Sequence, residues 1–385
     1  MDQLTVVYAL EEPPRTFRKS VFLAGPTPRD QKATSWRPDA IEKLKAAHFD
    51  GVIFVPEARD GVWHGDKAAQ IEWEERCLHL SDCIMFWVPR NLETMLALTT
   101  NVEFGRWEDS GRVVYGAPHS AVRNDYLAYY AEKLDIPTAE TLDELIDSVL
   151  AMVGDGASRT DGEREVPLHI WRTPAFTQWF ENLQRAGNRL DHARLVWTFR
   201  VGPGRRFVLF WALHVDIYIT TENRYKTNEV VLARPDISTI VMYQRAAKLD
   251  DCLIVLVREF RSPVSNIEGY VTEIAGGSTF KPGGNPLQLA AEEAHEETGL
   301  SIESSRFHIH EARQLAATMS AHKAHLFSVE VTDDELDQIR QQAGVAFGVL
   351  EDTERTYVSV STLGDIRRAD TVDWSILGMI LQVLA

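Results

Sequence analysis

Short apolar runs alternate with amphipathic segments through the first 150 residues of the chain. The apolar runs read as buried strands at 20–25, 51–56, 82–89 and 112–118. Segments with the apolar spacing of helices lie at 36–48, 66–80, 101–109, 119–133 and 141–153. This alternation predicts a doubly wound parallel sheet with helices on both faces. In such a sheet, ligands bind at the carboxyl ends of the strands.

The polar segment 154–167, GDGASRTDGEREVP, is nearly free of apolar residues and predicts a linker. After it we expect a helix over 174–186, aromatic-rich strands, and a second α/β region. The predicted division is a first domain at 1–155, a linker and aromatic-rich extension at 156–225, and a second domain at 226–385.

Composition narrows the range of functions. The chain has 385 residues, of which 44% are apolar and 25% charged, enough for two domains with separate cores. Its net charge of -17 argues against binding a nucleic-acid polymer, although small nucleotides remain possible ligands. The three cysteines form no paired framework or metal spacing. Because there is no signal-peptide pattern and no long apolar stretch, we expect a cytoplasmic protein that does not bind membranes.

A cluster of carboxylates ends a predicted helix that begins after Asn285 and stops at Gly299. Glu293, Glu296 and Glu297 fall at positions i, i+3 and i+4, where like charges repel. A divalent cation that prefers oxygen ligands, Mg or Mn, would offset this repulsion. The alternative is a solvated acidic helix end without a ligand.

The stretch EEAHEETGL, residues 292–300, and the Gly-rich loop before it resemble the Nudix box. That motif reads Gly, five residues, Glu, seven residues, then Arg-Glu-apolar-any-Glu-Glu-any-Gly-apolar. The resemblance implies an α/β/α Nudix fold. It also implies that Glu293, Glu296 and Glu297 bind Mg or Mn.

Three positions depart from the motif. Glu292 stands in place of the Arg and Gly284 in place of the upstream Glu, while the first Gly fits only as Gly277 with one inserted residue. The core Glu-Glu-any-Gly-apolar pattern remains.

The flanking segments REFRSPV and EIAGG resemble the ADP-ribose pyrophosphatase branch of this family. The resemblance implies that Arg258, Arg261 and Glu273 contact a nucleoside diphosphate derivative. It implies metal-assisted attack of water on a pyrophosphate, with Glu296 and Glu297 taking part. For the late acidic residue that activates water, Glu351 and Glu354 are the candidates.

In the first domain, a predicted strand runs into the turn Gly25–Pro26, followed by Arg29. Backbone N–H groups in such a turn, together with an arginine, can receive a phosphate or sugar hydroxyls. Further along the chain, Thr100 and Asn101 precede Glu103 in the stretch LTTNVEFG.

These features resemble the nucleoside 2-deoxyribosyltransferase family over residues 20–150. The resemblance implies that Glu103 is the sugar nucleophile, with Glu74 or Asp82 as helper carboxylate. Ala97 stands where the family usually has an Asp, which favours hydrolysis or a different glycoside over transfer between deoxynucleosides. The alternative for Glu103 is a helix N-terminal carboxylate that serves only the helix dipole.

Together the two resemblances predict a bifunctional nucleotide-processing hydrolase. One half would cleave or transfer an N-glycosidic bond, and the other would cleave a nucleoside diphosphate derivative with Mg or Mn. The alternative is an N-glycosidase regulated by a Nudix half that only senses a nucleotide such as ADP-ribose or NAD. Relatives in both families complete their sites across subunits, so we expect a homodimer.

Overall fold

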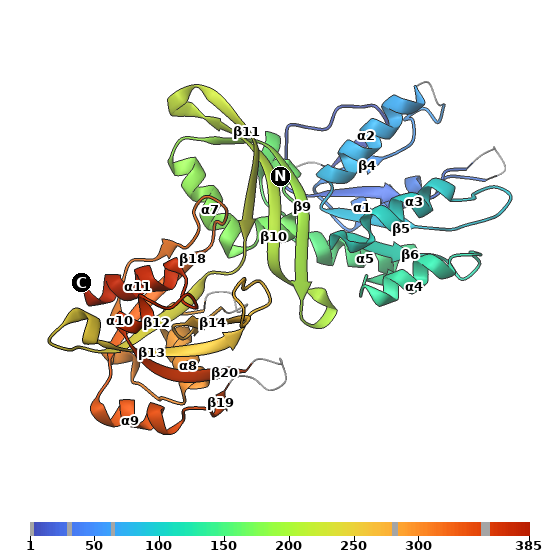
Figure 1. Ribbon diagram of the computed structural model, residues 1–385. Helices are drawn as coiled ribbons and strands as arrows, with labels where there is room; N and C mark the ends of the chain where they lie inside the picture. The colour runs from blue at the N-terminus through green and yellow to red at the C-terminus, as the bar shows by residue number, and fades with distance from the viewer. Residues whose placement is uncertain (1–3, 29–32, 63–65, 279–283, 348–354) are drawn as a thin grey trace. The chain divides into compact units, whose positions relative to one another are not determined.

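The computed structural model describes residues 4–28, 33–62, 66–278, 284–347 and 355–385. The chain divides into two compact units, Met1–Leu232 and Ala233–Ala385 (Figure 1). Within the described ranges, none of the helices has both the length and the apolar character needed to cross a bilayer.

The first unit contains a parallel sheet of six strands in the order β1-β4-β3-β5-β6-β7. The strands are β1 (Thr5–Tyr8), β3 (Ser20–Ala24), β4 (Val52–Val55), β5 (Cys83–Trp87), β6 (Val113–Gly116) and β7 (Thr138–Ala139). Four of them, β3 to β6, are the four predicted apolar runs, and every residue in them is buried. Chain order reverses between β3 and β5, and this reversal opens a crevice at the carboxyl ends of the strands.

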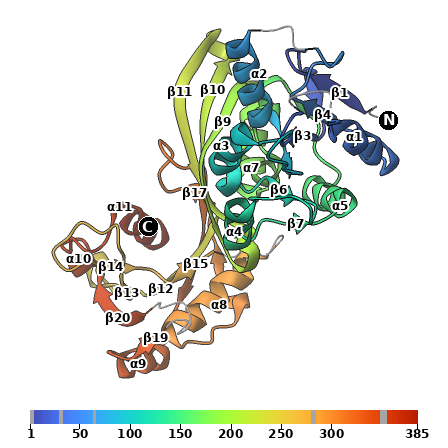
Figure 2. The same cartoon turned by 90° about the vertical axis from the view of Figure 1, so that its right-hand side faces the viewer.

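Helices cover both faces of this sheet, as predicted. They are α1 (Arg37–Ala46), α2 (Lys67–Leu80), α3 (Leu98–Trp107) with the short η1 (Glu108–Ser110), α4 (Asp125–Lys133) and α5 (Leu142–Val153). One core packs α2, α3 and α4 against the sheet, and a second core packs α1 and α5 against the other face (Figure 2). Helix α4 starts later than predicted, because the chain first makes a turn closed by the Ala121 N–H and the Pro118 carbonyl.

The first unit also contains a three-stranded sheet in the order β11-β10-β9, in which β9 and β10 pair antiparallel. The remaining elements of the first unit, including the strands of this sheet, are β2 (Thr16–Phe17), β8 (Arg159–Thr160), η2 (Asp161–Glu165), α6 (Leu168–Trp171), α7 (Pro174–Arg185), β9 (Arg189–Val201), η3 (Pro203–Arg205), β10 (Phe207–Ile219), η4 (Thr220–Glu222) and β11 (Arg224–Ala233).

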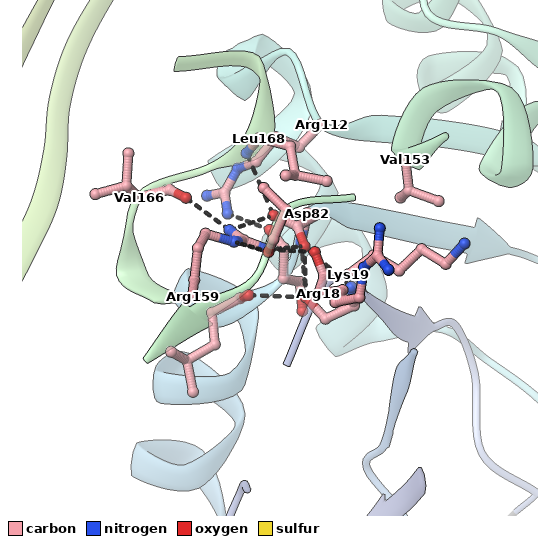
Figure 3. A network of polar contacts seen from close by, with 12 residues as sticks. Arg18, Lys19, Asp82, Arg112, Val153, Arg159, Val166 and Leu168 are labelled. Carbon is pink, nitrogen blue, oxygen red and sulfur yellow. Dashed lines mark hydrogen bonds and ion pairs between the residues drawn. The ribbon is translucent and has the colours of Figure 1, made fainter. Parts of the chain in front are cut away.

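The segment predicted as a linker is instead part of the first unit. Arg159 reaches the amino end of the parallel sheet and pairs with Asp82 through two contacts of 2.9 and 2.6 Å (Figure 3). The two side chains are 0% and 1% exposed. Arg159 also donates to the carbonyl oxygens of Val166 at 2.7 Å and Arg18 at 3.1 Å. Because this buried ion pair ties the segment to the sheet, the chain divides after Leu232 and not near residue 155.

The second unit is a mixed α/β structure around one sheet. The path β16-β18-β12-β13-β20-β19 forms most of it, and β12 and β18 pair in parallel. Its elements are β12 (Ile237–Gln244), η5 (Leu249–Asp251), β13 (Leu253–Phe260), β14 (Tyr270–Glu273), β15 (Gly276–Gly277), α8 (Pro286–Thr298), η6 (Ser304–Arg306), β16 (His308–Ile309), β17 (Arg313–Gln314), β18 (Lys323–Glu330), α9 (Asp333–Gln341), β19 (Ala346–Phe347), β20 (Thr356–Thr362), α10 (Leu363–Ile366) and α11 (Trp374–Leu384). One core holds α8 and α9, and another holds α10 and α11.

The predicted carboxylate-bearing helix is present as α8 with the expected ends. The Asn285 side chain caps it by accepting a hydrogen bond from the Leu287 N–H at 3.0 Å. Gly299 ends it with φ of 71°, a left-handed conformation that glycine adopts without steric cost.

Candidate active site

A pocket of about 920 Å³ lies at the carboxyl ends of β3, β4 and β5. Its wall combines the turn after β3, residues 56–58 after β4, and the first turns of α2 and α3. This is the edge of a doubly wound sheet where ligands bind. We call it the Glu103 pocket, after the carboxylate that α3 places in its wall.

Glu103 shares this pocket with Glu74, which comes from α2. The pKa of Glu103 is raised to about 7, mainly by burial and then by the charge of Glu74, while Arg37 opposes the shift. Burial also raises the pKa of Glu74, against the hydrogen bond from the Gln70 amide at 2.8 Å and the charge of Arg37. Two carboxyl groups that discourage each other's ionisation can divide the tasks of nucleophile and acid.

Arg37 lines the pocket and hydrogen-bonds to the backbone at the end of β3 and in the turn after it. It is 1% exposed and donates from Nε to the Leu23 carbonyl at 2.9 Å and from Nη2 to the Gly25 carbonyl at 2.7 Å. Its Nη1 pairs with Glu57 at 2.5 Å, and Glu57 also accepts from the Ser35 hydroxyl. A buried guanidinium with this many acceptors fixes the turn after β3 and supplies positive charge beside the carboxylates.

Arg37 was not predicted as a site residue, although its position in the sequence is unusual. Arg37 is the first residue of α1, where the helix dipole disfavours a cation. Glu57 was also not predicted. It follows the end of a buried strand, at the edge of the sheet where ligands bind.

The predicted turn Gly25–Pro26 lines the pocket. Gly25 has φ of 146°, and a Cβ there would lie 2.2 Å from the Trp87 carbonyl oxygen, so a side chain at this position is excluded. The Pro26 carbonyl accepts a hydrogen bond from the Trp36 indole at 3.2 Å. Arg29, the third residue predicted here, lies outside the described residues.

Other predicted residues fall elsewhere. Thr100 is 1% exposed and Asn101 accepts from the Arg90 guanidinium, while Ala97 and Thr99 from the same turn line the pocket. Asp82 lies at the amino end of β5, the opposite edge of the sheet, where its carboxylate is occupied by Arg159. The structure therefore brings Glu74 to Glu103 and does not bring Asp82.

In the second unit, α8 places two of its three predicted metal ligands against β15. The Glu297 carboxylate is 6% exposed and accepts from the Gly276 N–H at 3.0 Å. Glu293 faces Gly277 so closely that a Cβ there would lie 2.1 Å from its Oε1. Glu296 is exposed.

The fit of these residues to a metal ion is incomplete. Over the described ranges of the chain, no three His, Cys, Asp or Glu side chains are grouped so that they can hold a metal ion. Glu351 and Glu354, predicted to contribute here, lie outside those ranges. Glu293 and Glu297 are the members of the predicted ligand set that the structure describes beside β15.

The predicted substrate-binding residues of the second unit separate into two groups. Arg261 lies 2.8 Å from Glu259 and 3.5 Å from Glu273, and burial raises the pKa of Glu273. Arg258 instead pairs with Glu268 at 2.8 Å and stacks over the Tyr270 ring.

Comparison with protein families agrees with the first unit's geometry. Residues 18–121 match the family described as nucleoside 2-deoxyribosyltransferase like. The matched range runs from β3 to β6 and contains both Glu74 and Glu103, so it supports a domain of this kind. A comparison with curated proteins found no match.

Proposed function

We propose that the first unit cleaves the N-glycosidic bond of a nucleoside or nucleotide, with Glu103 as the nucleophile. The observation that carries this proposal is the pair of carboxyl groups, Glu103 and Glu74, in one pocket at the ligand-binding edge of the sheet. The family match supports glycosyl transfer or cleavage as the class of reaction.

The chemistry requires one ionised and one protonated carboxyl group. The Glu103 carboxylate attacks the anomeric carbon, and the C–N bond breaks with its electron pair going to the base. The departing base takes a proton from Glu74. Water then attacks the glycosyl ester and returns a proton to Glu74, which releases the sugar and restores both groups. Ala97, in place of the family's usual Asp, favours water over a second base as the acceptor.

The test is release of free base from nucleosides and nucleoside monophosphates, measured by chromatography. We expect Glu103→Gln to lower the rate by at least about a thousandfold and Glu74→Gln to lower it less, because a nucleophile is harder to replace than a proton donor. Glu72→Gln is the matched control, since Glu72 is exposed on the same helix as Glu74. Unchanged base release in Glu103→Gln would refute the proposed nucleophile.

A second proposal concerns the second unit, which we infer binds a nucleoside diphosphate derivative and cleaves it with Mg or Mn. The support is the placement of Glu293 and Glu297 beside β15 and of Arg261 beside Glu273. The alternative is a unit that binds such a ligand without cleaving it and regulates the first unit.

Hydrolysis of ADP-ribose with added Mg or Mn tests this second proposal. We expect activity in the wild type that is lost in Glu297→Gln and kept in Glu292→Gln, because Glu292 is exposed. If ADP-ribose binds without being cleaved and changes the rate of base release, the regulatory alternative replaces cleavage.

A further inference from the structure

A second pocket in the first unit is lined by two arginines and two histidines, in a chain of net charge -17. It has a volume of about 410 Å³ and lies between the last turns of α2 and α3 and the strands β9 and β10. Four of its side chains are basic, namely Arg106, Arg194, His79 and His214. We call it the arginine pocket. It does not overlap the Glu103 pocket, because the two share no lining residue.

The two arginines of the pocket differ in their ion pairs. Arg194 is exposed and has no ion pair among the residues described. Arg106 pairs with Glu75 at 2.5 Å, with both side chains about half exposed. An exposed pair of this kind contributes little stability, so an incoming anion can take over Arg106 at small cost.

His79 lies in the same wall, where a charged imidazole is disfavoured. Its pKa is lowered to about 4, mainly by burial and then by the charges of Arg112, Arg194 and Arg106, while Glu75 opposes the shift. Its Nε2 is buried and makes no hydrogen bond, since the nearest carboxylate oxygen, on Glu75, is 3.9 Å away.

Other arginines near the pocket have structural roles. Arg112 donates to the carbonyl oxygens of Leu78, His79 and Ser81 and so closes the end of α2. Arg200 of β9 and Arg205 of η3 reach Asp109, just beyond α3, and tether these two elements there. Arg194 takes part in neither arrangement, and it remains the pocket's available guanidinium.

The rest of the wall is apolar. Trp107 packs edge-on against His79 with ring centroids 4.7 Å apart, and Leu195 and Val196 continue the surface along β9. A volume of about 410 Å³ falls in the range of small-molecule sites. An anion with an organic part fits this lining better than a bare ion does.

From these observations, we propose that the arginine pocket binds a small phosphate-bearing organic molecule through Arg194 and Arg106. Guanidinium groups from two different elements match the several oxygens of a phosphate, which accepts forked hydrogen bonds. A phosphate dianion also balances two arginines, whereas a single carboxylate balances one. The site is separate from the proposed glycosidase reaction and does not depend on it.

Calorimetric titration of the full chain with phenyl phosphate tests this assignment. Phenyl phosphate has an aromatic part and a phosphate but no glycosidic bond, so it is not a substrate for the Glu103 pocket. We expect one saturable site, no binding of the neutral analogue phenol, and weaker binding of inorganic phosphate.

Variants locate the bound phosphate. Arg194→Gln should weaken binding at least about tenfold, and Arg194→Lys should fall between, because lysine keeps the charge and loses the fork. Arg206→Gln, at an exposed arginine beyond η3, and Glu103→Gln should leave binding unchanged. Equal affinity in wild type and Arg194→Gln, equal binding of phenol, or no saturation up to about 10 mM would each overturn the proposal.

Discussion

At the scale of single residues, the proposed role of Glu103 can be tested through its ionisation. Its pKa is raised to about 7, chiefly by burial, so the carboxylate forms only as the pH approaches neutrality. A nucleophile must be ionised, whereas a proton donor must not be. The direction of the pH dependence therefore distinguishes the two roles.

We predict that kcat/KM for base release rises with pH through an apparent pKa near 7, set by the free enzyme's Glu103. Initial rates measured from pH 5 to pH 9 check this. A rate that only falls from pH 5 upward would assign Glu103 the role of the acid.

The same pKa predicts a stability change. The pKa of Glu103 is raised from 4.5 to about 7 on folding, so the unfolded chain loses its proton first as pH rises between these values. The free energy of unfolding should fall across this window by on the order of 2 kcal/mol. Glu103→Gln removes that loss, so it should gain stability relative to wild type between pH 5 and pH 8 while losing activity. Urea unfolding at pH 5 and pH 8 measures the change in the free energy of unfolding for each protein. The Glu72→Gln variant should show the same change as the wild type.

The grouping of the candidate residues was partly predictable from the sequence. Glu103 and Glu74 stood out because a family resemblance placed carboxylates at those positions, and the fold brings them into one pocket. Asp82 was misplaced because it directly precedes β5 and so lies at the amino end of the sheet, not at the edge where the pocket forms. Arg37 was overlooked because its importance depends on carbonyl groups that only the folded turn presents.

At the scale of elements, local patterns predicted four of the strands and the helices of the first unit's parallel sheet, but not the role of the segment after α5. The caps of α8, Asn285 and Gly299, follow from local backbone chemistry, and both were predicted. The segment 154–167 has few apolar residues, so periodicity gave it no place in a core. What fixes it is the long-range pair between Arg159 and Asp82, which are 77 positions apart.

This pair predicts a large effect from a small change. Asp82→Asn leaves the Arg159 charge buried without its partner and should lower the free energy of unfolding by roughly 3 to 5 kcal/mol. Replacing both residues, as in Asp82→Leu with Arg159→Met, should recover much of that loss because no charge then remains buried. Chemical denaturation of the three proteins provides the comparison. A single variant as stable as wild type would contradict the assigned role.

At the scale of the whole molecule, the division into units predicts which fragments fold. A fragment of residues 1–232 keeps Arg159 with Asp82 and should unfold cooperatively, as should 233–385. A fragment of residues 1–155 lacks Arg159 and exposes the amino end of its sheet, so it should aggregate or melt without a sharp transition. Calorimetric melting of the three fragments tests this, and a sharp transition for 1–155 would restore the shorter boundary.

The Asp82–Arg159 pair also orders events during protein synthesis. All six strands of the parallel sheet leave the ribosome before Arg159 does, so Asp82 is then a charge that the sheet cannot bury without a partner. The amino end of the sheet must stay hydrated until the chain through Leu168 has emerged, because Arg159 and the Leu168 N–H both supply hydrogen bonds to Asp82. Completion of the first unit is thus delayed past the end of its own sheet. A pause in translation before residue 159 would prolong exposure of the unfinished sheet to chaperones and proteases.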